Sequence, residues 1–398
     1  MFLKYIALLR FHRTLAGLSL VQLICYFGAW FSHAGIFTLL IELNAPTWAL
    51  STAVAIAFIP SVILAPFNGI IIDKLPKKPL MLALLLTESI SVLMLLIIDD
   101  LSFLWLLFIL IFIRLGVGAL YFQTEMSLLP AILARSHLRM ANEIHSMIFA
   151  FAYTAGIGLA GVFVHFWGVK ASFIFDFMLY CAGIFVLFRT SFTEPRLANS
   201  AKGLLLMLKE VLIYLKNEPA IFHLMALHAL VAVFSFDTIV TLLVDYEYKG
   251  ILSVALAIGF LNMSRAFALC VGPVILARFV SDKNLFYFFI FQAFGIVLWA
   301  FLQANFYTSL LGIALAVIFC NSIWSYTISK LQSACKREFY GRIMAYNDML
   351  YFLIASFIAS ASGLFYELGM SLRNITLLLA LILLLGGFYW RFVARKYL

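Results

Sequence analysis

Charged side chains are scarce in this sequence. Lysine, arginine, aspartate and glutamate make up 11% of its 398 residues, whereas hydrophobic residues make up 65%. In soluble domains about a quarter of the residues are charged. A soluble chain of this length also has too little interior to bury so much apolar surface. The composition therefore excludes a water-soluble globular protein and predicts a chain surrounded by lipid.

Metal-binding and catalytic motifs are also absent from the sequence. Its five cysteines stand far apart, with no Cys-x-x-Cys pair and no spacing typical of a disulfide framework or a zinc site. No nucleotide-binding loop, Gly-x-Ser-x-Gly element or His-Glu-x-x-His element is present. We therefore expect no metal, no cofactor and no enzymatic activity.

Long apolar runs are what the sequence has in abundance. A membrane-spanning helix needs about 20 mostly apolar residues, and the runs lack the alternation that a transmembrane strand would require. The predicted spans are 15–42, 50–72, 79–98, 101–122, 142–166, 170–189, 219–244, 251–277, 284–303, 306–329, 342–366 and 372–391. The sequence thus predicts an all-α integral membrane protein with twelve transmembrane helices.

The distribution of basic residues predicts the orientation of these spans. With the N-terminus placed in the cytoplasm, 22 of the 27 lysines and arginines fall in cytoplasmic segments. Only Lys170, Lys249 and Arg373 fall on the opposite side. Because cytoplasmic loops carry an excess of lysine and arginine, we expect an inner-membrane protein with both termini in the cytoplasm. The net charge of +9 then reflects topology, and we expect no nucleic-acid partner.

The longest break between spans divides the chain into two halves. Residues 1–189 and 219–398 are each predicted to form a six-helix bundle, joined by a linker over 190–218. Within this linker, lysines alternate with leucine-rich stretches, which is typical of an amphipathic helix lying on an anionic lipid surface. A simple tether is the alternative. A division into two similar halves is typical of secondary transporters, whose substrate sites lie near the membrane midplane.

The loop between the second and third spans carries the most specific motif. Its sequence resembles the Gly-x-x-x-Asp-Arg/Lys-x-Gly-Arg/Lys-Arg/Lys signature of the major facilitator superfamily, with proline at position 76 where the family has glycine. The resemblance implies a twelve-helix fold of two bundles and transport by alternating access. It also implies a conformational latch in which the aspartate accepts from a helix N-terminus and from a cation. The latch residues are Gly69, Asp73, Lys74, Lys77 and Lys78.

Shorter elements resemble the macrolide-efflux and enterobactin-exporter-like branch of that superfamily. Arg114 and Gly118 match the Arg-x-x-x-Gly element of proton-coupled exporters, and Phe173–Asp176 is similar to the start of that branch's sixth helix. The resemblance implies a proton-coupled exporter, an antiporter of small amphipathic molecules such as drugs, metabolites or a siderophore. The fifth span lacks the branch's usual proline, so an importer or a lysophospholipid transporter of the same fold is the alternative. We expect it to act as a monomer, with substrate, protons and membrane lipid as its partners.

Ionisable residues inside the spans are the candidate coupling and cavity residues. Each such residue is costly in lipid, by roughly 2.5–3.5 kcal/mol on insertion scales, and therefore suggests a function. We expect Arg114 at the centre of a coupling site, with carboxylates beside it as proton carriers; bracing of helices is the alternative. One histidine well inside a span is added because imidazole titrates near neutral pH. The candidates are His33, Glu88, Arg114, Asp176, Asp237 and Arg265.

Overall fold

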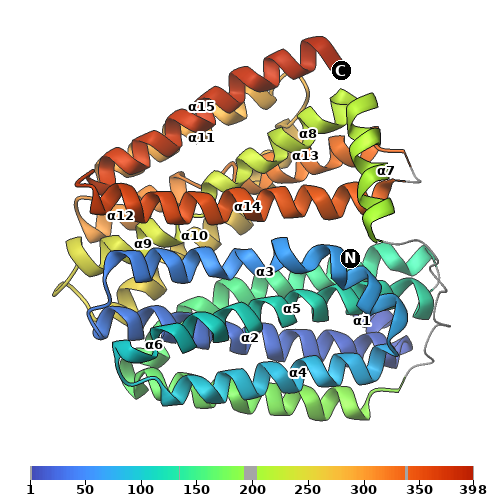
Figure 1. The fold of residues 1–398 in the computed structure, drawn as a ribbon, viewed down its shortest axis with the longest axis horizontal. Helices are drawn as coiled ribbons and strands as arrows, with labels where there is room; N and C mark the ends of the chain where they lie inside the picture. Colours follow the sequence, from blue (N-terminus) through green and yellow to red (C-terminus); the bar gives the residue numbers. More distant parts are fainter. Residues whose placement is uncertain (1, 134, 192–203, 337–338, 398) are drawn as a thin grey trace. The chain divides into compact units, whose positions relative to one another are not determined.

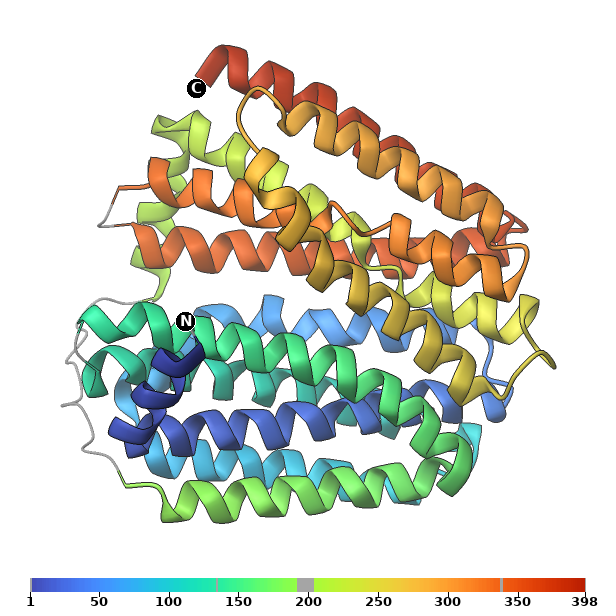
Figure 2. The same cartoon turned by 180° about the vertical axis from the view of Figure 1, so that it is seen from behind.

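The computed structural model describes residues 2–133, 135–191, 204–336 and 339–397 (Figures 1 and 2). Regular structure in these ranges is helical, apart from one isolated bridge between Lys249 and Leu252. The α-helices are α1 (Phe2–Phe11), α2 (Arg13–Glu42), α3 (Thr47–Lys74), α4 (Lys77–Met94), α5 (Leu104–Ile132), α6 (Arg135–Arg189), α7 (Leu204–Asn217), α8 (Pro219–Ala229), α9 (Asp237–Leu242), α10 (Val254–Leu276), α11 (Leu285–Leu302), α12 (Phe306–Leu315), α13 (Cys320–Ala334), α14 (Tyr340–Glu367) and α15 (Leu372–Tyr397). Short 3₁₀ or π turns extend several of them.

The described residues contain eleven helical segments that are long and apolar enough to cross a membrane. One of them, Ile144–Arg189, has 46 residues and would measure about 69 Å as a single helix at 1.5 Å per residue. That is more than twice the hydrocarbon thickness of about 30 Å. Gly168 divides this segment, because its φ of 82° is a left-handed conformation that breaks the helix and favours glycine. The predicted all-α fold with twelve crossings is therefore confirmed.

The chain folds into two compact units. The first contains residues 1–43 and 66–200, and the second contains residues 44–65 and 201–398. Helix α3 is accordingly shared, and its N-terminal part packs within the second unit. There the Thr47 hydroxyl lies 3.0 Å from the Tyr246 hydroxyl, and Ser356 donates to the carbonyl of Ala55 at 3.2 Å.

Close packing of α2 against α6 organises the first unit. Phe31 and Ala34 of α2 meet Ala160 of α6 in a fully apolar cluster. Small residues permit this approach: a Cβ on Gly156 would lie 2.9 Å from the Trp30 ring, so only glycine leaves enough room. Such contacts replace the hydrophobic effect as the driving force between helices in lipid.

Two spans of the second unit are interrupted helices. Residues 219–247 run as α8, a 3₁₀ turn, α9 and a π turn, and residues 306–334 run as α12 and α13. The backbone groups released at the second break are satisfied by Gln292 of α11, whose amide donates to the Ala316 carbonyl and accepts from the Phe319 N–H at 2.9 Å. Irregular backbone at membrane depth requires such partners. Helix α11 also runs beside α15 (Figures 1 and 2).

Helix α7 belongs to the second unit, where its Val211 and Tyr214 side chains join an apolar cluster and the Tyr214 hydroxyl accepts from the Lys336 N–H at 3.1 Å. The Tyr214 ring stacks on Phe339 with 4.3 Å between centroids, and Arg342 donates to Glu210 at 2.6 Å. Residues 192–203 of the expected linker lie outside the described residues.

We expect Gly272→Ala to destabilise the second unit. A Cβ at position 272 would collide with the backbone carbonyl of Ile318, which cannot rotate away. Overpacking of this kind typically costs about 1–3 kcal/mol, measurable as a lower unfolding temperature of the purified protein in detergent. Gly386→Ala is the matched control, because its Cβ would meet the flexible end of Leu230 at 3.1 Å and the Phe289 ring at an ordinary contact distance of 3.5 Å. Equal unfolding temperatures for the two variants would contradict the packing described for Gly272.

Candidate functional site

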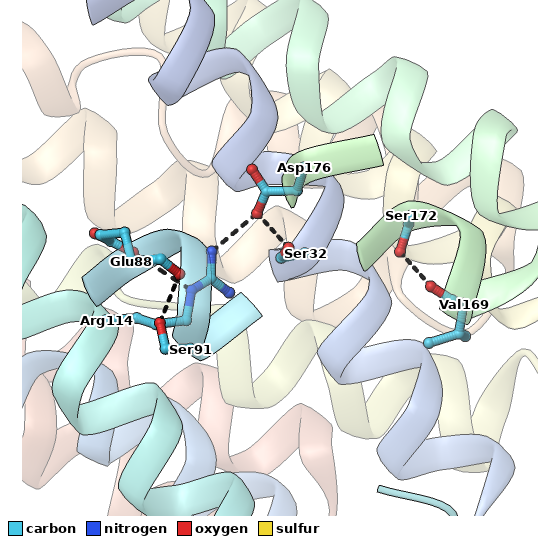
Figure 3. A network of polar contacts seen from close by, with 7 residues as sticks. All are labelled: Ser32, Glu88, Ser91, Arg114, Val169, Ser172 and Asp176. Carbon is cyan, nitrogen blue, oxygen red and sulfur yellow. Dashed lines mark hydrogen bonds and ion pairs between the residues drawn. The ribbon is translucent and has the colours of Figure 1, made fainter. Parts of the chain in front are cut away.

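A buried arginine lies between two buried carboxyl groups inside the first unit (Figure 3). Nη2 of Arg114 on α5 donates to Oδ2 of Asp176 on α6 at 3.0 Å. Nε of Arg114 lies 3.5 Å from Oε2 of Glu88 on α4, an ion pair without hydrogen-bond geometry. Arg114 is 5% exposed, Glu88 6% and Asp176 0%. The structure thus brings together three residues that were predicted from separate spans; we call them the Arg114 cluster.

Four helices build the Arg114 cluster, and glycines make room for its carboxylates. Ser32 of α2 donates to the same Asp176 oxygen that accepts from Arg114. A Cβ on Gly28 would lie 2.6 Å from Asp176 Oδ1, and a Cβ on Gly118 would lie 2.9 Å from Glu88 Oε1. The Arg-x-x-x-Gly spacing on α5 therefore has a local physical reason: Arg114 binds the Glu88 carboxyl, and the glycine one turn later leaves room for it.

The composition of the Arg114 cluster creates a charge imbalance. One guanidinium faces two carboxyl groups, so the cluster carries one net negative charge when both acids are ionised. With one proton bound it is neutral. Because an uncompensated charge is costly in a buried, lipid-surrounded site, the geometry favours one bound proton in this closed arrangement.

A second predicted pair meets in the second unit. Arg265 of α10 donates to Oδ1 of Asp237 at 2.8 Å, and Asp237 begins α9, directly after the break in that span. The two side chains are 9% and 18% exposed. Interrupted helices in transporters typically place polar groups at binding sites near the membrane midplane. The break before Asp237 could not be predicted from hydropathy.

We expect a strong energetic coupling between Asp237 and Arg265. Neutralising either residue alone leaves its partner charged in a mostly buried site, so D237N and R265Q should each destabilise more than the double variant. A coupling energy of about 0.5–3 kcal/mol is typical of directly paired residues and can be obtained from unfolding of the four proteins. The same cycle on the exposed pair Lys170–Asp99 serves as control and should be additive. Additivity at Asp237–Arg265 would contradict the pairing.

The remaining predicted residues are His33 and the latch segment. His33 neighbours Ser32 on α2, but its ring packs against Trp30 and Phe37, with 5.2 and 5.0 Å between centroids. In the latch segment, Lys77 is buried and donates to the Ile72 carbonyl, and Lys78 donates to the Phe188 carbonyl at 3.1 Å. Lys74 ends α3 and is exposed. At Gly69 and Asp73 the structure describes the helical backbone alone.

Two buried ionisable residues were not predicted from the sequence. Glu125 and His145 are 0% and 4% exposed, and their side chains lie 3.6 Å apart. The fourth span was expected to end at residue 122, whereas α5 continues to Ile132. The apolar residues Met126, Leu128 and Leu129 that follow Glu125 were the signal in the sequence that the helix continues. In the structure, Thr124 and Glu125 are completely buried while Phe122 is 40% exposed, so the polar side of the helix faces the bundle. Among the described residues, no group of three or more His, Cys, Asp or Glu side chains is placed to hold a metal ion.

Comparison with known families identifies the class of protein. A model described as the Major Facilitator Superfamily matches residues 18–360, and the chain belongs to this family. The superfamily predicted from the loop motif is thereby confirmed, and the chain is a multi-pass membrane transporter, a class that moves small molecules rather than catalysing reactions.

Individual relatives are distant. An uncharacterized MFS-type transporter of Bacillus subtilis (strain 168), YfiS, is 23% identical over 217 residues, which are 53% of this chain and 51% of the relative. The alignment thus spans about half the length of this curated relative.

Solved structures of the same fold match nearly the whole chain. The POT family transporter PepTSo has a TM-score of 0.73 at 13% identity, over 97% of this chain and 98% of that one. The nucleoside transporter NupG has a TM-score of 0.70 at 13% identity, over 97% and 99%. A bacterial homologue of the iron transporter ferroportin has a TM-score of 0.72 at 16% identity, over 96% and 99%. At these identities the similarity establishes the fold alone.

Proposed function

We propose that this transporter is a proton-coupled exporter of small amphipathic molecules, with the Arg114 cluster as its coupling site. The observation that carries the proposal is the ratio of two buried carboxyl groups to one guanidinium. Closed off from water, the cluster is most stable with one proton. When it opens to water, the cost of its net negative charge falls, and the proton is released. A proton gradient can then bias the transport cycle, because protonation has unequal affinity for the two states.

Within the cluster, Glu88 is the better candidate for the proton carrier. Asp176 accepts hydrogen bonds from both Arg114 and Ser32 through one oxygen, which favours its ionised form. Glu88 has the looser 3.5 Å contact with Arg114 Nε and also faces the neutral Tyr180 side chain of α6. Asp176 therefore serves as the permanent counter-ion of Arg114, and Glu88 gains and loses the proton.

The substrate class is supported by aromatic side chains near the cluster. On α2, Trp30 and His33 flank Ser32 in partly buried positions, and Trp30 packs against Tyr153 of α6 with 4.6 Å between centroids. Rings with a polar edge suit a largely apolar compound that carries a few polar groups. The export direction follows the Arg114-x-x-x-Gly118 element, which resembles that of proton-coupled exporters.

The remaining features of the proposal concern topology. The protein lies in the inner membrane as a monomer with both termini in the cytoplasm. Residues 1–189 and 219–398 act as the two bundles, 190–218 links them, and the 69–78 segment is a latch that opens and closes with the transport cycle. Asp237 and Arg265 are the coupling or substrate-binding pair of the second bundle.

The test uses everted membrane vesicles energised to a proton gradient and challenged with amphipathic compounds and siderophores. A compound that collapses the gradient with the wild-type protein, but not with Glu88→Gln, supports proton-coupled export and identifies the substrate class. Asp99→Asn, which removes an exposed carboxylate, is the control and should respond like wild type. A well-folded, inserted protein that gives no response across the panel contradicts export and directs the search to an importer or a lysophospholipid transporter.

A further inference from the structure

A second buried polar group lies along α5 from the Arg114 cluster. Glu125 follows Arg114 by eleven residues on the same helix, a separation of about 16 Å at 1.5 Å per residue. His145 of α6 places Nε2 at 3.6 Å from Glu125 Oε1. Neither residue contacts the Arg114 cluster directly in a hydrogen bond or ion pair within the described part of the chain.

The polar atoms at this position have no hydrogen-bond partner among the described residues. They are both carboxylate oxygens of Glu125, both ring nitrogens of His145 and the hydroxyl of Tyr121, which interacts electrostatically with Glu125. Buried polar groups without partners are rare, and each one calls for an explanation such as a bound ion or proton. Because these unsatisfied polar atoms gather around the Glu125 carboxyl group, they indicate a binding site for an ion or a proton.

Among the described side chains, no lysine or arginine is paired with Glu125. The described titratable groups that interact with it are Tyr121 on its own helix, Cys25 and Tyr26 from α2, and His145 from α6. Cys25 also interacts electrostatically with Glu88 and Asp176 of the Arg114 cluster. An apolar cluster formed by Leu8, Leu15, Leu129, Leu133, Ala141 and Ile144 borders the site at the end where α1 packs.

The protonation states of Glu125 and His145 determine the net charge of this pair and therefore what it binds. Without a proton the pair carries one negative charge, and with two protons it carries one positive charge. Either state is costly in a buried site with no countercharge among the described side chains. With one proton the pair is neutral, and because burial disfavours a separated carboxylate and imidazolium, the proton resides on Glu125 as a carboxylic acid beside a neutral imidazole.

We propose that Glu125 and His145 form a second proton-binding site, separate from the Arg114 cluster, that holds one proton while it is closed to water. This first bundle then carries two exchangeable protons at different depths. The proposal concerns proton binding at Glu125 and His145 and stands whether or not the Arg114 cluster couples transport.

The test follows the infrared absorbance of protonated carboxyl groups in the purified full-length protein as the pH is raised. The neutral triple variant Glu88→Gln, Arg114→Gln, Asp176→Asn removes the carboxyl groups of the Arg114 cluster without leaving an unpaired buried cation, and it provides the background. Adding Glu125→Gln to this background should remove the signal of one buried, titrating carboxyl group per protein. Adding His145→Gln instead should keep that signal, since the proton resides on Glu125 with or without the imidazole. Adding Asp99→Asn is the control and should leave the buried carboxyl signal unchanged.

An unchanged buried carboxyl signal after Glu125→Gln would overturn the proposal. A signal that responds to sodium at constant pH, and not to choline, would also overturn it and indicate a sodium site. If the single variant does not yield monodisperse protein, the neutral pair Glu125→Gln with His145→Gln replaces it, because it leaves no unpaired buried charge. The same loss of one carboxyl signal is expected from that double variant.

Discussion

Replacing Arg114 by alanine should abolish transport and strongly destabilise the protein. The substitution leaves Glu88 and Asp176 buried with no cation between them. Removing one partner of a buried ion pair typically costs about 3–5 kcal/mol, because the remaining charge is uncompensated. We therefore expect a clearly lower unfolding temperature in detergent and no gradient-driven transport in vesicles.

Two further variants separate the roles of charge and shape at position 114. Arg114→Lys keeps the charge, but a compact ammonium does not reproduce the guanidinium fork that contacts both carboxyl groups, so stability should recover partly and transport should not. The neutral triple variant Glu88→Gln, Arg114→Gln, Asp176→Asn should recover stability without proton coupling. If Arg114→Ala keeps wild-type stability and transport, the charge argument for the Arg114 cluster is wrong.

Replacing Glu88 by glutamine should uncouple transport from the proton gradient. Glutamine fits the space beside Gly118 and Arg114, so substrate binding and exchange across the membrane should continue. Glutamine binds no proton, however. A proton gradient shifts the equilibrium between the two conformations of the transporter only if the proton binds one conformation more tightly than the other. The substrate concentration ratio across an energised vesicle membrane should therefore fall to about one, while exchange of labelled for unlabelled substrate persists.

The matched variant is Asp176→Asn. It removes the hydrogen-bonded counter-ion of Arg114 and so should lower stability, with a loss of about 1–3 kcal/mol for a buried donor that loses its acceptor. Gradient-driven accumulation by Glu88→Gln at the wild-type level would show that the proton is carried elsewhere.

The fold could be predicted from the sequence because lipid imposes simple rules on length, hydropathy and charge. The predicted spans agree with the observed helices wherever a polar loop separates two neighbouring spans. The breaks at residues 230–236 and 316–319 could not be predicted, because neither stretch contains proline or glycine. They depend on tertiary partners such as Gln292.

The site could be predicted only in part. Glu88, Arg114 and Asp176 were recognisable because each is an ionisable residue inside an apolar run. Their contact depends on packing, since Arg114 and Asp176 are separated by 62 positions in sequence. Glu125 was missed because Gln123, Thr124 and Glu125 resemble the start of a loop. In lipid, a helix can continue through such residues when their side chains face the bundle interior and its apolar residues face outward.

The central claim is that the Arg114 cluster exchanges one proton when the transporter binds its substrate. The most direct measurement is the number of protons released when a substrate identified in vesicles is added to purified protein in weakly buffered detergent solution. We predict a stoichiometric release by wild type and its loss in Glu88→Gln at unchanged substrate binding. Substrate binding without proton release by the wild-type protein, or undiminished release by Glu88→Gln, would contradict the account.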